Sequence, residues 1–325
     1  MDTFDEFTAA EIDAAQLKLA PHLERTPVLP LHSARVRDAL GSQTQIWLKL
    51  ELLQRTGSFK ARGALTNIFA LDPAALSRGI TAVSAGNHAI AAAYAAQVAG
   101  TSAKVIMIES ANALRIARSR EYGAEVLLAG NAHQAFAQAE KIVREEGRSM
   151  IHPFEGRNTA LGTATLGAEF VRQVPGLEAV IVPIGGGGLC AGVSAAVKLL
   201  APGCKVYGVE PEGADSMRRS FAAGSVQSIE RVNTIADSLG APYALPITFS
   251  LCRRFVDDLV LISDDQIRAA MRLLLEDAKL AVEPAGAAAT AALLGPLRER
   301  VAGKKVGIIV CGANIDAASF LRLLG

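Results

Sequence analysis

The sequence predicts an α/β fold in which parallel, twisted sheets are flanked by helices and divided between two lobes. Strand-like and helix-like segments alternate along most of the 325 residues, and such alternation is typical of parallel sheets with helices on both faces. A chain of this length is long enough for about two domains. Because no low-complexity linker interrupts it, we expect two closely joined lobes with a cleft between them.

The elements follow in order from the N-terminus. Residues 9–19 have helical spacing, and two prolines make residues 26–30 a stiff extended segment. Short apolar runs predict strands at residues 46–50, 79–83, 103–108, 125–128, 179–184, 205–210, 259–262 and 306–310. Helices are expected at residues 63–71, 87–99, 113–122, 132–146, 163–174, from 189 onward, and 264–279. Ligands of such sheets bind beyond the carboxyl ends of strands, so the residues that directly follow a strand are the candidates.

The amino-acid composition limits the classes of molecule that this protein is expected to bind. The 33 basic and 32 acidic residues nearly cancel, which gives no electrostatic footprint for nucleic acid or an anionic membrane. No apolar run approaches the roughly 20 residues that span a bilayer, and residues 1–6 are acidic without an apolar signal core. We therefore expect a cytoplasmic protein with a small-molecule partner. The cysteines form no CxxC pair and predict reduced, mostly buried thiols; they are Cys190, Cys204, Cys252 and Cys311.

Lys60 lies at an unusual position in the sequence for a lysine. It follows the Gly57-Ser58 turn signal and opens an Ala-rich segment that predicts a helix. One interpretation is a surface lysine, since lysines are rarely buried. The other is an amine in a partly apolar site, where a lowered pKa frees the lone pair to form a Schiff base.

Four glycines, Gly185 to Gly188, join a strand to a helix. Glycine N–H groups approach an anion closely and a helix N-terminus adds its dipole, so this loop predicts a phosphate site. A turn that binds nothing is the plain alternative. The spacing G-x-G-x-x-A, completed by Ala191 with Glu210 on the next strand, also allows a nicotinamide cofactor. That fingerprint belongs to the first strand-helix unit of a nucleotide domain, however, and it leaves Lys60 unexplained.

Two further segments follow strands. Ser84 to His88 form a turn whose N–H groups and Asn87 amide suit a carboxylate or a ring hydroxyl, although Ser84 could instead be a helix cap. Cys311 ends the last strand, where it is either an active-site group or a buried core thiol.

Together, five segments resemble the serine/threonine dehydratase family, whose members are pyridoxal-phosphate enzymes of the tryptophan-synthase-β fold (fold type II), with serine racemase a close relative. The segments are residues 58–64, 84–88, 185–188, 282–286 and 311–314. The resemblance implies a large cofactor-binding domain of residues 1–77 and 155–325 and a small substrate-side domain of residues 78–154. It also implies a homodimer, as is usual for relatives.

The resemblance assigns roles to single residues. Lys60 is the catalytic Schiff-base lysine, and Phe59 lies beside the cofactor ring. Cys311 faces the ring nitrogen. The remaining assignments are a phosphate loop at Gly185, Gly186, Gly187 and Gly188, a ring-hydroxyl partner at Asn87, and a substrate-carboxylate site at Ser84, Ala85, Asn87 and His88.

The implied reaction is α,β-elimination, with Lys60 as the general base. A β-hydroxy-α-amino acid such as L-threonine or L-serine would give a 2-oxo acid and ammonia. A larger or acidic substrate, phenylserine or 3-hydroxyaspartate, is an alternative. Arg157 is then the candidate partner for a second carboxylate, unless it is an ordinary surface arginine. A β-replacement enzyme of the same fold is another alternative, and an NAD-dependent oxidoreductase is more distant.

The sequence departs from the family pattern at positions that bear on racemisation, on cation binding and on the surroundings of the cofactor ring. Ala85 stands where racemases carry a second serine, and a methyl group cannot move a proton. The family's divalent-cation site matches Glu210 and Ala214, but Ser216 replaces its acidic residue, and a hard cation prefers charged oxygen ligands. Ser238 replaces a glycine beside the ring.

Overall fold

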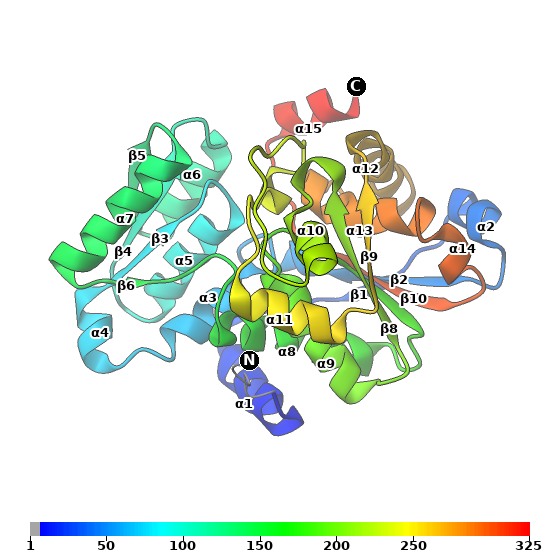
Figure 1. The fold of residues 1–325 in the computed structure, drawn as a ribbon, viewed down its shortest axis with the longest axis horizontal. Coiled ribbons are helices and arrows are strands. Elements are labelled where there is room, and N and C mark those ends of the chain that lie inside the picture. The colour runs from blue at the N-terminus through cyan, green and yellow to red at the C-terminus, as the bar shows by residue number, and fades with distance from the viewer. Residues whose placement is uncertain (1–6) are drawn as a thin grey trace.

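The computed structural model describes residues 7–325, so the acidic segment on which the cytoplasmic prediction depends lies outside the described residues. Figure 1 shows two sheets with helices packed around them. The larger has the strand order β1-β2-β10-β7-β8-β9, and the smaller has the order β5-β4-β3-β6. Only the β1 pairing with β2 is antiparallel among the described strand pairs. The predicted α/β class is confirmed.

The strands of the larger sheet come from both ends of the chain, whereas those of the smaller sheet are contiguous. The larger sheet contains β1 (Val28–Pro30), β2 (Gln45–Leu50), β7 (Ala179–Pro183), β8 (Lys205–Pro211), β9 (Asp258–Ile262) and β10 (Lys305–Val310). The smaller contains β3 (Ile80–Val83), β4 (Ala103–Ile108), β5 (Glu125–Ala129) and β6 (Ser149–Met150). The domain boundaries at residues 77 and 155 stay a prediction.

The helices cover both sheets. They are α1 (Ala9–Leu19), α2 (Ala34–Leu40), α3 (Lys60–Ile68), α4 (Pro73–Arg78), α5 (Asn87–Val98), α6 (Ala113–Glu121), α7 (Ala132–Glu146), α8 (Arg157–Gln173), α9 (Gly188–Leu200), α10 (Ser216–Ala223), α11 (Pro246–Phe255), α12 (Asp264–Ala278), α13 (Pro284–Leu294), α14 (Arg298–Val301) and α15 (Ala317–Leu324). In the described part of the chain, none is long and apolar enough to cross a membrane.

The predicted bounds of α1, β4 and α7 agree with the structure. Helix α8 begins at Arg157, six residues before the predicted start at 163, because Gly156 with φ 110° supplies the turn that lets the helix begin directly after it. Helix α13 was not expected. It is apolar all round and buried along nearly its whole length, so it shows none of the one-sided periodicity by which surface helices are found.

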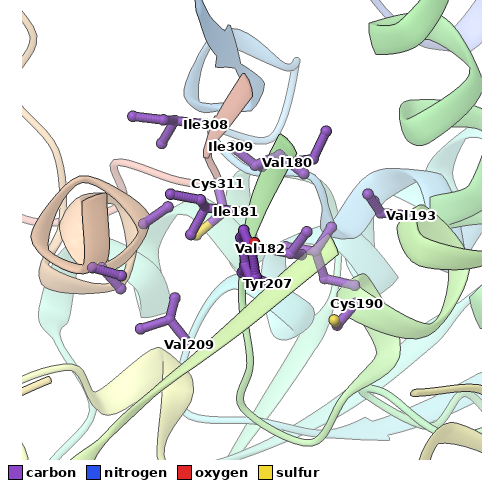
Figure 2. Close-up of a cluster of buried hydrophobic side chains, with 14 of the residues drawn as sticks. Val180, Ile181, Val182, Cys190, Val193, Tyr207, Val209, Ile308, Ile309 and Cys311 are labelled. Carbon is purple, nitrogen blue, oxygen red and sulfur yellow. The ribbon is translucent and has the colours of Figure 1, made fainter. Parts of the chain in front are cut away.

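The core of the larger sheet lies between its central strands and helix α9. Figure 2 shows Cys190 and Val193 of α9 on one side of β7, and Ile181, Ile308 and Cys311 on its other side; all belong to one cluster of buried side chains. All four cysteines are free and buried, as expected. A functional side chain at Cys311 is therefore held by a rigid, close-packed neighbourhood.

A buried group of charges fixes the start of helix α3. Arg62 donates to Glu51 at 2.8 Å and to Glu169 at 3.1 Å, while Lys49 lies 2.5 Å from Glu169. These side chains come from α3, the segment after β2, helix α8 and strand β2, and all are almost fully buried. Because the charges balance inside the core, the pairs are strongly oriented, and they hold the helix turn that begins at Lys60.

Candidate active site

Lys60 is the first residue of helix α3, which begins three residues before the predicted start at 63, so the expected position of Lys60 near a helix start is confirmed. The turn before it lies against the end of β10: Ser58 pairs with Gly312, and Phe59 N donates to the Cys311 carbonyl oxygen at 3.1 Å. The Lys60 amine is partly buried, donates to the Pro153 carbonyl oxygen at 2.5 Å, and lies 5.2 Å from the centre of the Phe59 ring. The amine thus points into the protein and not along a solvated face.

Burial lowers the pKa of Lys60 from 10.5 to about 8, although the negative charge of Glu283 acts in the opposite direction. Two histidines beside it stay neutral. Burial lowers the pKa of His88 to about 3 and that of His152 to about 4, and the positive charge of Lys60 acts in the same direction. Lys60 is therefore largely neutral above about pH 8, well below the pH at which an ordinary lysine loses its proton, and the neutral amine is the state required of a nucleophile or base.

The glycine loop follows β7 and contains backbone N–H groups that have no partner within the helix that follows. Gly187 has φ 92° and caps helix α9, whose first bond runs from Ala191 N to the Gly187 carbonyl at 2.8 Å. The N–H groups of residues 188–190 precede that bond and are free of helical partners. A Cβ on Gly186 would lie 2.2 Å from the Phe154 ring, so this position excludes any side chain. Such a loop is suited to a phosphate.

The residues predicted to hold a cofactor line one hollow. It brings together Phe59, Lys60, Asn87, Gly185, Gly186, Gly187, Gly188 and Cys311. The set fits pyridoxal phosphate: an amine with a lowered pKa for the aldehyde, N–H groups for the phosphate, and an aromatic side chain and a thiol for the ring. A Cβ on Gly185 would approach Leu239 to 3.0 Å, so only a glycine backbone fits along that side of the hollow.

Cys311 directly follows the carboxyl end of β10. Its Sγ donates to the Ala285 carbonyl oxygen at 3.3 Å. Burial, and after it the negative charge of Glu283, raises the pKa of the thiol far above its usual value of 9. Cys311 is therefore an uncharged thiol at any physiological pH.

The turn from Ser84 to His88 follows the carboxyl end of β3. Ser84 Oγ accepts from Gly86 N at 3.1 Å, and the first backbone bond of this turn runs from Ala89 N to the Gly86 carbonyl. The N–H groups of Asn87 and His88 precede that bond. The His88 ring donates from Nε2 to the Ile151 carbonyl at 2.8 Å and is buried, so it offers the site its backbone N–H and a ring already tied to the strand end.

The Asn87 side chain is held from two sides. Its Nδ2 donates to Glu283 Oε1 at 2.6 Å, and its Oδ1 accepts from Asn314 Nδ2, also at 2.6 Å. Glu283 appears in the sequence analysis only within the segment 282–286 and is assigned no role there. Burial raises its pKa from 4.5 to about 7, although Arg115 and the Asn87 hydrogen bond act the other way.

Arg115 was missed by the sequence analysis. It is buried on helix α6, and it donates to Asp237, to the Asn314 carbonyl at 2.8 Å and to Glu283 at 3.2 Å. It also reaches the Ser238 hydroxyl at 3.4 Å. No local pattern marks a single arginine in an amphipathic helix, so the signal was absent from the sequence.

A second, larger cavity of about 510 Å³ opens beside the hollow. Lys60 and Asn87 line both spaces, and Ser84, Ala85 and His88 line the larger one. Its size is typical of small-molecule sites, which measure roughly 300 to 1,000 Å³. Lys60 thus lies between the hollow, which suits a ring that carries a phosphate, and the larger cavity, which has room for a second small molecule.

Arg157 does not line this cavity. Its guanidinium donates to Glu11 at 2.6 Å and lies 5.0 Å from the Phe7 ring. The interpretation of Arg157 as a partner for a second substrate carboxylate is therefore wrong: at the start of α8 its side chain pairs with α1 instead.

The candidate cation residues have other partners. Glu210 is buried and accepts from Met217 N at 2.9 Å and Arg218 N at 2.7 Å, while Ser216 donates to the Ala241 carbonyl. Ala214 is buried beside them. Among the described residues, no group of three or more histidine, cysteine or acidic side chains is placed to hold a metal ion. The cation site stays a prediction.

Comparison with known proteins agrees with this geometry. The family model described as "Pyridoxal-phosphate dependent enzyme" matches residues 19–312. A phenylserine dehydratase of Ralstonia pickettii is 57% identical over 87% of this chain and 86% of its own, and an L-threonine ammonia-lyase of Thermotoga maritima is 38% identical over 98% and 78%. The structure of maize serine racemase superimposes with a TM-score of 0.91 at 35% identity, covering 96% of this chain and 95% of that one. The chain belongs to the family of pyridoxal-phosphate dependent enzymes.

Proposed function

We propose that this enzyme eliminates water from a β-hydroxy-α-amino acid and releases a 2-oxo acid and ammonia. The observation that carries the proposal is Lys60, an amine whose pKa is lowered to about 8, placed where a glycine phosphate loop and a substrate-sized cavity meet. The relatives named phenylserine dehydratase and L-threonine ammonia-lyase support elimination from such a substrate.

We assign the cofactor to the hollow. The N–H groups of the Gly185 to Gly188 loop would bind the phosphate, with Phe59 and Cys311 beside the ring and Asn87 at its hydroxyl. When bound, pyridoxal phosphate supplies an electron sink for negative charge that develops at the substrate's Cα. Cys311 stays a neutral thiol there and adds no charge to the ring nitrogen.

The protein's own groups bind and deprotonate the substrate. The N–H groups of Asn87 and His88, at the start of α5, would hold its carboxylate. Lys60 Nζ would take the proton from Cα as the general base. The Cα–H and Cβ–O bonds break, a Cα=Cβ bond forms, and the hydroxyl takes up a proton and leaves as water. The resulting enamine gains a proton at Cβ to become an imine, and water then replaces nitrogen by oxygen at Cα and releases ammonia. The reaction is balanced without an oxidant or reductant.

The test is release of 2-oxo acid from L-serine, L-threonine, threo-3-hydroxyaspartate and threo-phenylserine by enzyme supplied with pyridoxal phosphate. At least one substrate should be converted, and Lys60→Ala should lower the rate by at least about a hundredfold, the usual share of a general base. Oxo acid from none of the four would point instead to β-replacement. Because the cavity cation Arg115 is already bonded to Asp237 and Glu283, we expect 3-hydroxyaspartate to be a poor substrate.

We further propose that residues 78–154 form the small substrate-side domain and that the enzyme is a cytoplasmic homodimer, which the family resemblance supports. Size-exclusion chromatography with light scattering tests the oligomer. A particle of 34.0 kDa, the mass of one chain, would contradict it.

A further inference from the structure

The cavity beside Lys60 is lined by both polar and apolar residues. Its polar groups, Arg115, Asp237 and Ser238, are bonded to one another at the edge of the cofactor hollow. Val83, Ile106, Ile108 and Phe136 are apolar lining residues of the same cavity, and we name these four the apolar wall; His133 and Tyr243 also line the cavity. The proposed function places the substrate's carboxylate at the N–H groups of Asn87 and His88 and its amine at the cofactor beside Lys60, which leaves the β-substituent to face the apolar wall.

The apolar wall is built from the smaller sheet and the helix that covers it. Val83 ends β3, Ile106 and Ile108 end β4, and Phe136 lies on the second turn of α7, all in the left half of Figure 1. Val83 and Ile106 are buried in a small core cluster, and Phe136 packs against it while remaining partly exposed. Val83 and Ile106 are therefore held in place by the core, whereas the Phe136 ring keeps exposed apolar surface at the cavity.

The charges of the cavity argue against an acidic β-substituent. Arg115 already contacts two carboxylates, Asp237 and Glu283, and we assign Lys60 to the cofactor. A carboxylate on Cβ that faced the apolar wall would leave water for an apolar surface, which is costly, although the exposed His133 lies at the same cavity. An apolar group gains from the same surface, and an aromatic ring gains most because it buries the largest area.

We infer that the apolar wall binds an aryl group on the substrate's Cβ and that Phe136 and Ile108 determine the preference for aromatic over aliphatic substrates. This inference rests on the proposed function for the placement of carboxylate and amine. A hydroxyl and a methyl on Cβ, as in threonine, would leave most of the 510 Å³ cavity filled with water against apolar side chains. A phenyl ring would displace that water and stack on or against Phe136.

The test compares the binding of two unreactive amino acids to the holoenzyme. L-Phenylalanine and L-alanine lack the β-hydroxyl, so neither can be dehydrated, and the ratio of their dissociation constants in calorimetry measures the contribution of the aryl group. The native enzyme should bind L-phenylalanine much more tightly. Phe136→Ala should reduce the ratio roughly tenfold, since an aromatic pair contributes a factor of about 2 to 12 in addition to the area it buries.

Two variants support the comparison. Phe69→Ala is the matched control, because Phe69 is also partly exposed but lines a separate cavity between α1 and α3; its ratio should equal that of the native enzyme. Ile108→Thr keeps the β-branched shape and adds a hydroxyl to the wall, and it should lower the ratio even if Phe136→Ala fails to fold.

The outcomes separate the inference from the proposed function. An unchanged ratio in both Phe136→Ala and Ile108→Thr overturns the inference, as does a native enzyme that binds the two amino acids equally, even if threonine is dehydrated. A ratio that falls in both variants, in an enzyme that releases no 2-oxo acid from any substrate, upholds the aryl site and refutes the dehydratase.

Discussion

The guanidinium of Arg115 lies 3.2 Å from the carboxylate of Glu283, and these two residues are 168 positions apart in the chain. Arg115 belongs to helix α6 over the smaller sheet, and Glu283 caps helix α13 beside the larger one. Both side chains are almost fully buried. The contact therefore joins the two halves of the fold at the wall of the active site, and through Asn87 it also sets the orientation of a predicted cofactor ligand.

The two members of this pair should respond unequally to substitution. Arg115→Met leaves Glu283 buried without a positive partner and should cost about 3 kcal/mol of unfolding free energy. Glu283→Gln keeps an acceptor for Asn87, and Arg115 keeps Asp237, so the expected cost is only about 1 kcal/mol. Denaturant unfolding of the apoenzyme measures both values. Equal costs would show that the pair is not what stabilises this region.

The pKa of Lys60 should control cofactor uptake. Only the neutral amine can capture the aldehyde, so the rate at which apoenzyme takes up pyridoxal phosphate should rise with pH and level off above about 8, the pKa of this lysine. Because Glu283 raises that pKa, Glu283→Gln should move the midpoint to lower pH. Stopped-flow absorbance follows the uptake. A rate still rising steeply at pH 10 would refute the lowered pKa.

The neutral histidines should make the apoenzyme sensitive to acid. In the folded protein the pKa values of His88 and His152 are about 3 and 4, below the ordinary 6.5. The unfolded chain therefore takes up two more protons as pH falls, so this stability is present above pH 6.5 and is lost toward pH 4.

Neutral side chains that copy the histidine hydrogen bonds test this loss. His88→Gln can keep the Nε2 donor to Ile151, and His152→Asn can keep the acceptor for Phe154 N and Glu155 N. Each should reduce the acid slope of the unfolding free energy by up to about 1.4 kcal/mol per pH unit. His133→Gln, at an exposed position of α7, is the control. Slopes identical to that of the native protein would assign the acid sensitivity to other groups.

The glycine loop should tolerate no added methyl group. In Gly186→Ala the new Cβ would lie 2.2 Å from the Phe154 ring, so the ring must leave or the loop must open, and affinity for pyridoxal phosphate should fall at least roughly tenfold, the result of a loss of about 1.4 kcal/mol. Gly203→Ala is the matched control, since its Cβ meets nothing within 4 Å. Equilibrium dialysis measures the affinity of each variant for the cofactor. Equal affinities would contradict a phosphate site in the glycine loop.

Sequence motifs located the parts of the site that depend on local backbone. Lys60, the loop from Gly185 and the turn from Ser84 all follow a strand and contain turn residues, so their shared edge of the fold could be predicted. Arg115 and Glu283 could not be predicted as a pair, because their contact depends on how two distant helices pack. Phe136 looked like any apolar residue of the amphipathic helix α7, and nothing in its neighbours shows that it faces a cavity.

Strand order also bears on how a ribosome makes this protein. The smaller sheet uses strands from residues 80–150 only, so its pairing can form while later residues are still being synthesised. Strand β10, residues 305–310, lies between β2 and β7, so the nascent chain keeps one edge of each of these strands unpaired until residues 305–310 emerge. Exposed strand edges invite pairing with other chains. Because Cys311 follows β10 and its carbonyl oxygen accepts from Phe59 N, the hollow that we assign to the cofactor is not complete until residues 305–311 have been synthesised.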